Sequence, residues 1–105
     1  MRLLKDVLYK AGIEEVSGST DVNIADVCFD SRAAREGSLF IAVRGTQVDG
    51  HSYIHSVVER GAVAVVCEQM PETLLTGITY VRVADSALAL AQIASNYYGN
   101  PSEKL

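Results

Sequence analysis

The stretch Ser38-Leu39-Phe40-Ile41-Ala42-Val43 is an almost unbroken apolar run that follows the Glu36-Gly37 turn. A run of this kind is typical of a strand that is covered on both faces of a sheet. Two more strand-like apolar runs occur at residues 62–67 and 79–84, and helical segments separate the strands. Short buried strands interleaved with helices predict a small layered α/β domain, with a mostly buried, mixed sheet flanked by helices.

Apolar residues at helical spacing predict three helices. The first covers residues 2–11, in which residues 4, 7, 8 and 11 form the apolar stripe. The second covers residues 51–60 and is closed by Gly61, because glycine suits the left-handed backbone at a helix end. The third begins at Asp85 or Ser86, either of which can cap it. The expected order is therefore helix, strand, strand, helix, strand, strand, helix.

A fourth strand, the first along the chain, is predicted at residues 24–31, after a polar, turn-like segment at residues 17–23. Side chains alternate along a strand, so Val27, Phe29 and Ser31 are expected on one face of the sheet. The intervening side chains would then point to the opposite face.

Composition sets limits on the class of protein. With 105 residues, of which 49% are hydrophobic and 21% charged, the chain is expected to form a single folded domain. The formal charge is −4 and the basic residues are scattered, which argues against a nucleic-acid partner. No apolar stretch reaches membrane-spanning length, and a charged amphipathic segment follows Met1. We therefore expect a cytoplasmic protein that binds neither nucleic acid nor membrane.

The two cysteines, Cys28 and Cys67, lie in strand-like apolar runs and have no neighbours at metal-ligand spacing. We expect both to be buried free thiols, which disfavours a redox or metal module. The sequence also lacks a phosphate-binding G-x-x-x-x-G-K-[ST] loop and a G-x-S-x-G nucleophile motif. No metal site is predicted, and no cofactor is expected to bind this domain.

Five short motifs occur in one order and at characteristic intervals: Asp30-Ser31-Arg32, Gly37–Ala42, Gly45, Asp49-Gly50-His51 and Gly61–Val66. Together they resemble the N-terminal domain of the Mur ligase family. The resemblance implies that this domain holds the UDP end of a UDP-N-acetylmuramoyl-peptide. It also implies a central domain of the same chain that binds ATP and Mg²⁺, and a C-terminal domain that receives the incoming amino acid.

Two branches of the family share this pattern. One adds the third residue of the stem peptide, meso-diaminopimelate or L-lysine, and the other adds D-alanyl-D-alanine. Residues 97–105 resemble the third-residue branch just before its central domain. We therefore expect residues 1–105 to be the substrate-binding N-terminal domain of a longer ATP-dependent carbon–nitrogen ligase, without catalytic residues of its own. A different class also fits the sequence, namely a free-standing interaction domain that contacts a partner protein and no nucleotide.

Ser31 is the first candidate ligand of the UDP moiety. Ligands of α/β sheets commonly bind outside strand ends, and Ser31 lies where the predicted strand gives way to a turn. Its hydroxyl could meet the diphosphate or uridine, or could instead cap the turn through its own backbone. Phe29 would add an apolar wall to the same pocket, or pack in the core. The matching family position is usually aliphatic, so Phe29 departs from the pattern.

The remaining candidates lie in turns and loops. Residues Thr46, Gln47 and Val48 could read the uracil edge through backbone and side-chain groups, or form a solvated connection. Asp30 and Arg32 are expected to pair and brace the turn, although Arg32 could also reach a phosphate.

His51 is expected to satisfy backbone N–H groups at a helix start. Neither His51 nor His55 is expected to be catalytic, since no nucleophile or partner acid is identifiable beside them.

Overall fold

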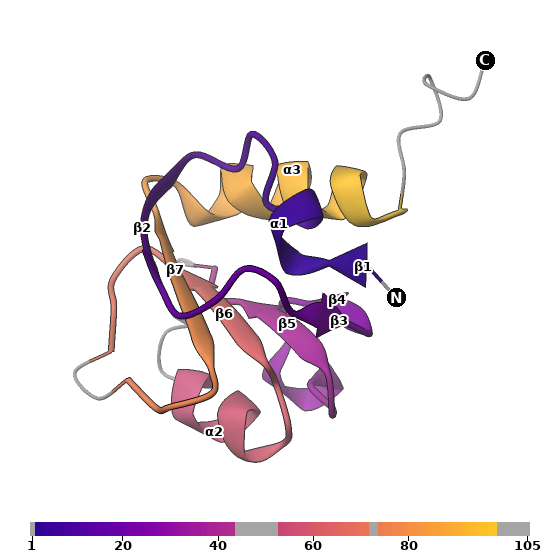
Figure 1. Cartoon of the computed structure of the whole chain (residues 1–105), viewed down its shortest axis with the longest axis vertical. Coiled ribbons are helices and arrows are strands. Elements are labelled where there is room, and N and C mark those ends of the chain that lie inside the picture. Colours follow the sequence, from indigo (N-terminus) through magenta and orange to yellow (C-terminus); the bar gives the residue numbers. More distant parts are fainter. Residues whose placement is uncertain (1, 44–52, 72–73, 99–105) are drawn as a thin grey trace.

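The computed structural model describes residues 2–43, 53–71 and 74–98. Its centre is a five-stranded sheet in the order β2-β7-β6-β5-β4 (Figure 1). Strands β4 to β7 pair in parallel, and β2 pairs antiparallel with β7. The predicted mixed sheet is thus confirmed. The strands are β2 (Ile13–Ser17), β4 (Asp26–Cys28), β5 (Ser38–Ile41), β6 (Ala64–Cys67) and β7 (Thr79–Val83).

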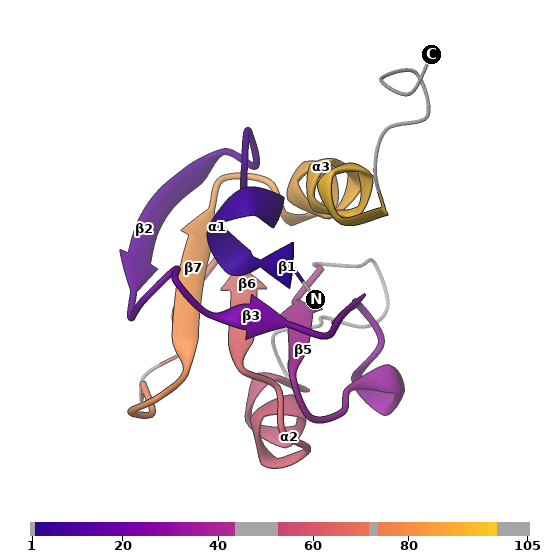
Figure 2. The same cartoon turned by 45° about the vertical axis from the view of Figure 1, so that its right-hand side comes forward.

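Helices cover both faces of this sheet, as predicted. Helices α1 (Leu4–Val7) and α3 (Ser86–Tyr98) lie on one side, and α2 (Ile54–Glu59) lies on the other (Figures 1 and 2). The 3-10 turn η1 (Ser31–Ala33) packs against α2. A separate two-stranded ribbon joins β1 (Arg2–Leu3) to β3 (Asn23–Ile24).

Alternation along the strands divides the core into two layers. All four residues of β5 and all four of β6 are buried, which confirms β5 as a central strand. Every second strand residue faces α1 and α3, and the residues between them face α2. The first layer includes Leu39, Ile41, Ala64, Val66 and Val81, and the second includes Cys28, Phe40, Val65, Cys67 and Tyr80.

The helix predicted at residues 2–11 is wrong in extent, although its apolar stripe is buried as expected. The backbone N–H groups of Leu4 and Lys5 donate to the carbonyls of Val22 and Thr20, and β1 pairs with β3. The first residues of the predicted helix therefore belong to the two-stranded ribbon. At the other end Lys10 has a φ of 61°, a left-handed conformation that ends a helix.

Two helix boundaries follow the predicted signals. The Asp85 carboxylate accepts hydrogen bonds from the N–H groups of Ala87 and Leu88, at 3.0 and 3.1 Å, and so caps α3. Gly61 follows α2 with a φ of 107°, which only glycine adopts readily.

Strand β2 was not predicted, and its position explains why. It lies at the sheet edge, and its side chains are mostly exposed, so it lacks the apolar signature of a buried strand. Its pairing with β7 is reinforced by Arg82, whose guanidinium contacts Glu14 at 2.9 Å and Glu15 at 3.2 Å. None of the described helices is long and apolar enough to cross a membrane.

Candidate nucleotide-binding site at the end of β4

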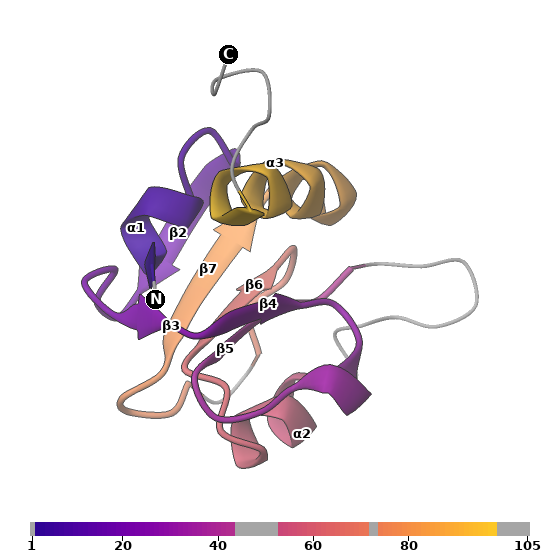
Figure 3. The same ribbon diagram turned by 90° about the vertical axis from the view of Figure 1, so that its right-hand side faces the viewer.

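The carboxyl ends of β4 and β5 lie side by side at one edge of the sheet, because the two strands are parallel neighbours. Beyond Cys28, the chain continues from β4 through Phe29 and Asp30 into η1 (Figure 3). This edge is the usual place for a ligand in an α/β sheet. The predicted site residues that the structure describes therefore lie at the edge of the sheet where a ligand is expected.

Asp30 and Arg32 form a two-point ion pair across the turn. The Arg32 side chain donates from Nη2 to Asp30 Oδ2 at 2.9 Å and from Nε to Oδ1 at 3.2 Å. The Arg32 backbone N–H also donates to Oδ1, at 2.9 Å. The Arg32 side-chain and backbone hydrogen bonds, together with its charge, lower the pKa of Asp30 below its usual value. The predicted bracing pair is confirmed, although it spans a 3-10 turn and not the face of a strand.

The Ser31 hydroxyl is left open by this arrangement. The side chain that caps η1 is Asp30, so the alternative in which Ser31 caps its own turn is wrong. Ser31 is half-buried, and within the described residues its hydroxyl has no hydrogen-bond partner. The hydroxyl is therefore available to a ligand at the sheet edge.

Phe29 does not occupy the position expected from strand alternation. Because β4 ends at Cys28, the alternation stops there, and Phe29 is 62% exposed whereas Val27 is 9% exposed. The prediction that the two share a face of the strand is wrong, and so is the core-packing alternative for Phe29. The ring instead stands in solvent beside the turn, where an apolar partner could cover it.

The predicted loop candidates Thr46, Gln47 and Val48 lie outside the described residues, as does His51. Their roles stay predictions. His55 is described, and it pairs with Glu59 one turn along α2, with Nε2 and Oε1 at 2.8 Å.

The two cysteines are free and buried, as predicted. Burial raises the pKa of Cys28 to about 11, with a further contribution from the charge of Asp26, and burial likewise raises the pKa of Cys67 to about 11. Both thiols are therefore protonated at neutral pH and are poor nucleophiles. Among the described residues, no group of three or more His, Cys, Asp or Glu side chains could hold a metal ion.

Tyr53, at the start of α2, is a candidate that the sequence did not single out. It is 39% exposed, and α2 packs against η1. The pKa of Arg32 is raised by its hydrogen bond to Asp30 and by the Asp30 charge, and Tyr53 makes a smaller contribution in the same direction. The only sequence signal was its place shortly after the Asp49-Gly50-His51 motif.

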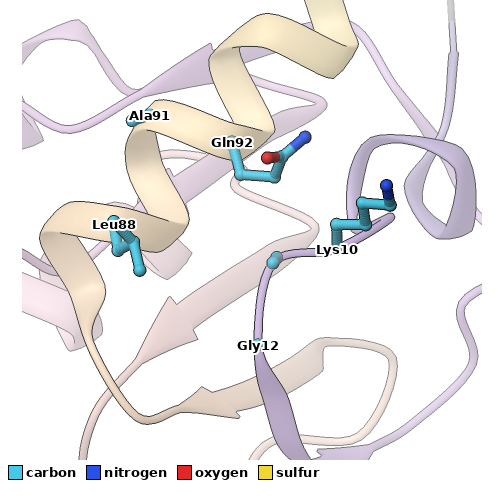
Figure 4. Close-up of a pocket in the computed structure, with 6 residues that line it drawn as sticks. Lys10, Gly12, Leu88, Ala91 and Gln92 are labelled. Atoms are coloured by element: carbon cyan, nitrogen blue, oxygen red, sulfur yellow. The ribbon is translucent and has the colours of Figure 1, made fainter.

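A hollow lies between α3 and the turn that follows α1 (Figure 4). Its polar side chains are Lys10 and Gln92, and Leu88 supplies an apolar wall. With one cation and one amide, the hollow lacks the pair of groups that acid–base chemistry needs.

Residues 23–98 match the model described as "Mur ligase family, catalytic domain". The chain belongs to the Mur ligase family. Among curated Mur ligases, it is 53% identical over 103 residues to the UDP-N-acetylmuramoyl-L-alanyl-D-glutamate--2,6-diaminopimelate ligase of Cytophaga hutchinsonii. It is 46% identical over 102 residues to the ligase of the same name from Bacteroides fragilis. Each match covers 97% of this chain, and the chain spans 21% of the length of each relative.

Solved Mur ligase structures share the fold. A crystal structure of MurF from Acinetobacter baumannii superposes with a TM-score of 0.61 and 32% sequence identity, covering 70% of this chain and 16% of that protein. A structure of the UDP-N-acetylmuramoylalanyl-D-glutamyl-2,6-diaminopimelate--D-alanyl-D-alanyl ligase from the same organism gives a TM-score of 0.60. The predicted small α/β domain of the Mur ligase type is thus confirmed.

Proposed function

We propose that this chain is the N-terminal domain of a ligase that adds the third residue to UDP-N-acetylmuramoyl-L-alanyl-D-glutamate, and that it binds the UDP moiety of that substrate. The observation that carries the binding role is the turn after β4. There Asp30 fixes η1 and leaves the Ser31 hydroxyl open at the carboxyl edge of the sheet. The reaction is taken from the names of the relatives, which are diaminopimelate-adding ligases.

The chemistry of each site residue suggests which part of the substrate it binds. Ser31 can donate to an anionic or carbonyl oxygen, and Phe29 offers an exposed ring to a base. The loop residues Thr46, Gln47 and Val48 are proposed to read the uracil edge, and His51 to support that loop. This domain then binds and orients one end of the substrate.

The bond-forming step belongs to other parts of a longer cytoplasmic enzyme. Elsewhere in that enzyme ATP, with Mg²⁺, would phosphorylate the substrate carboxylate and release ADP, and the amine of the incoming residue would then displace phosphate to form the amide. We assign neither group to this domain: the sequence has no G-x-x-x-x-G-K-[ST] loop, and the part of the chain that the structure describes has no group of three or more His, Cys, Asp or Glu side chains that could hold a metal ion. The proposed partners of this domain are therefore the UDP-linked substrate and a central ATP-binding domain of the same chain.

The D-alanyl-D-alanine-adding ligase is the second candidate, because solved structures of that kind superpose on this fold. The diaminopimelate-adding relatives are favoured by their higher identity, 53% against 32%. The two reactions use different acceptors. The natural full-length protein should consume ATP with UDP-N-acetylmuramoyl-L-alanyl-D-glutamate and diaminopimelate, and not with the corresponding tripeptide and D-alanyl-D-alanine.

The binding role is tested by calorimetric titration of the chain with UDP and with ADP. UDP is expected to bind more tightly, and Ser31→Ala is expected to weaken UDP binding about tenfold, which is the loss of one hydrogen bond to a charged group. A matched control is Ser56→Ala, an exposed serine within α2. Equal affinity for the two nucleotides, or no effect of Ser31→Ala, would contradict the proposal.

A further inference from the structure

Helix α3 exposes a face that is uncharged and largely apolar. Its 13 residues include no Asp, Glu, Lys or Arg. Ser86, Ala89 and Ile93 are buried on its inner side. Its exposed residues, which we call the outer face of α3, are Ala87, Leu88, Ala91 and Tyr98. Leu88 is 70% exposed and Tyr98 is 63% exposed, so large side chains of this face stand in solvent.

The polar side chains of α3 do not cover this face. The Gln92 side chain donates to Asn96 at 3.0 Å, and Asn96 donates to the backbone carbonyls of Val7 and Tyr9 at 2.9 and 2.7 Å. These amides therefore tie α3 to α1. The exposed residues of α2, by contrast, are polar: His55, Ser56 and Glu59. A surface helix normally exposes polar and charged side chains, as α2 does, so the outer face of α3 is suited to being covered.

A hollow adjoins the outer face of α3. It has a volume of about 370 Å³ and lies between Leu88 and Ala91 on one side and residues 10–12 on the other (Figure 4). A water molecule takes up about 30 Å³ in the liquid, so the hollow has room for a large side chain. The Lys10 amine lies over the Tyr9 ring, and within the described residues no carboxylate pairs with it. The hollow therefore combines an apolar wall with one available cation.

The proposed function supplies an occupant for this surface, namely the next domain of the same protein. The chain spans 21% of the length of its relatives, which extend well beyond it. Because α3 is the last described element, a domain that follows residue 105 is tethered close to the outer face. A tether raises the effective concentration of two surfaces for each other, so a modest apolar face is enough for docking.

We infer that the outer face of α3 and the adjoining hollow form the docking surface for the domain that follows residue 105 in the full-length protein. An apolar side chain of that domain enters the hollow beside Leu88, and a carboxylate pairs with Lys10. This inference rests on the proposed function, which supplies the following domain. Docking here leaves η1 uncovered, because η1 packs against α2 on the opposite side of the sheet. Substrate can therefore bind while the two domains are in contact.

The test compares the rate at which N-ethylmaleimide labels Ala91→Cys in the 105-residue chain and in the natural full-length protein, read by peptide mass spectrometry. Labelling in the full-length protein should be about tenfold slower, because a covered thiol reacts only while the domains are apart. Ser56→Cys, on the exposed side of α2, is the matched control and should react equally fast in both proteins. The native cysteines are buried and add little background.

A second substitution tests whether the apolar contact holds the domain in place. Adding Leu88→Glu to the full-length Ala91→Cys protein should restore fast labelling, and Ser56→Glu, which adds the same charge on α2, should not. A carboxylate in the first turn of a helix is favourable, so Leu88→Glu should leave α3 intact. If Ala91→Cys does not fold, Ala87→Cys, on the same face, decides by the same comparison.

Equal labelling of Ala91→Cys in the two proteins would overturn the inference, and so would slow labelling that Leu88→Glu does not relieve. Protection that grows with protein concentration would identify a second copy as the occupant and would overturn it too. A UDP titration of the full-length protein separates these results from the proposed function. Binding of UDP without protection of Ala91→Cys would leave the proposed function standing, whereas protection without binding of millimolar UDP would refute the nucleotide-binding role and retain the docking surface.

Discussion

The Tyr97 hydroxyl, near the end of α3, donates a 2.8 Å hydrogen bond to the backbone carbonyl of Ala25, which lies between β3 and β4. The N–H of Ala25 in turn donates to the carbonyl of Gly37, just before β5. Through Ala25, the last helix is tied to the segment that leads into the candidate site. The aromatic ring also packs against the core layer beneath α3.

Tyr97→Phe should destabilise the protein by about 1 kcal/mol, because it removes this hydrogen bond and keeps the packing of the ring. Urea unfolding measures the change. Tyr98→Phe is the control, since Tyr98 contacts Tyr97 edge-on but is largely exposed. Equal stability of the two variants would show that the bond to Ala25 contributes nothing.

Gly61→Ala should be much more damaging than Gly12→Ala, although both glycines have positive φ values of 107° and 77°. A Cβ on Gly61 would lie 2.7 Å from the Cα of Glu36, whereas a Cβ on Gly12 would meet no atom within 4 Å. The left-handed backbone costs about 1–2 kcal/mol at either position, and the clash adds at least about 1 kcal/mol at Gly61. Thermal unfolding of the two variants measures both losses of stability. A larger loss for Gly12→Ala than for Gly61→Ala would contradict the prediction.

Asp30→Ala should weaken UDP binding several-fold with little effect on global stability, because the carboxylate is exposed and acts on the local turn. Arg32 lowers the pKa of Asp30, so the pair is intact at neutral pH and is lost only as the pH falls through that lowered pKa. Asp21→Ala, which breaks the exposed pair with Lys5, serves as the control. Unfolding and UDP titration are both needed, and a large loss of stability without a change in binding would contradict this account.

The buried thiols should make stability depend on pH in the alkaline range. Their pKa values are raised from 9.0 to about 11, so the folded state retains protons that the unfolded state releases. Their contribution is complete below about pH 9 and is lost as the pH rises towards about 11. The free energy of unfolding should therefore fall more steeply across this window in the natural protein than in a Cys28→Val, Cys67→Val variant. Parallel pH profiles would show that the thiols do not carry the effect.

Local patterns were enough to predict the centre of the fold. The apolar runs of β5, β6 and β7, the Gly61 terminus and the Asp85 cap all depend on neighbouring residues, and each was confirmed. The β1–β3 ribbon and β2 depend on pairing between distant segments. A half-exposed edge strand such as β2 carries no apolar run from which that pairing could be predicted.

The candidate site was likewise predictable only where it depends on residues that are close in the sequence. Asp30 and Arg32 are two residues apart, so their pairing follows from local chemistry. The orientation of Phe29 depends on where β4 ends. The Asp30 side chain caps η1, and the strand therefore ends earlier than the alternation of side chains predicts. Tyr53 is a candidate only because α2, which it precedes, packs against η1, a tertiary contact that no local pattern encodes.

The most direct test of the central claim is an NMR titration of the labelled chain with UDP-N-acetylmuramoyl-L-alanyl-D-glutamate. The account predicts chemical-shift changes concentrated at residues 29–32, at residues 46–48 and at Tyr53, and weaker binding by Ser31→Ala. Shifts centred instead on the hollow between Lys10 and Leu88, or no shifts at millimolar ligand, would contradict the proposal that this edge of the sheet binds the nucleotide.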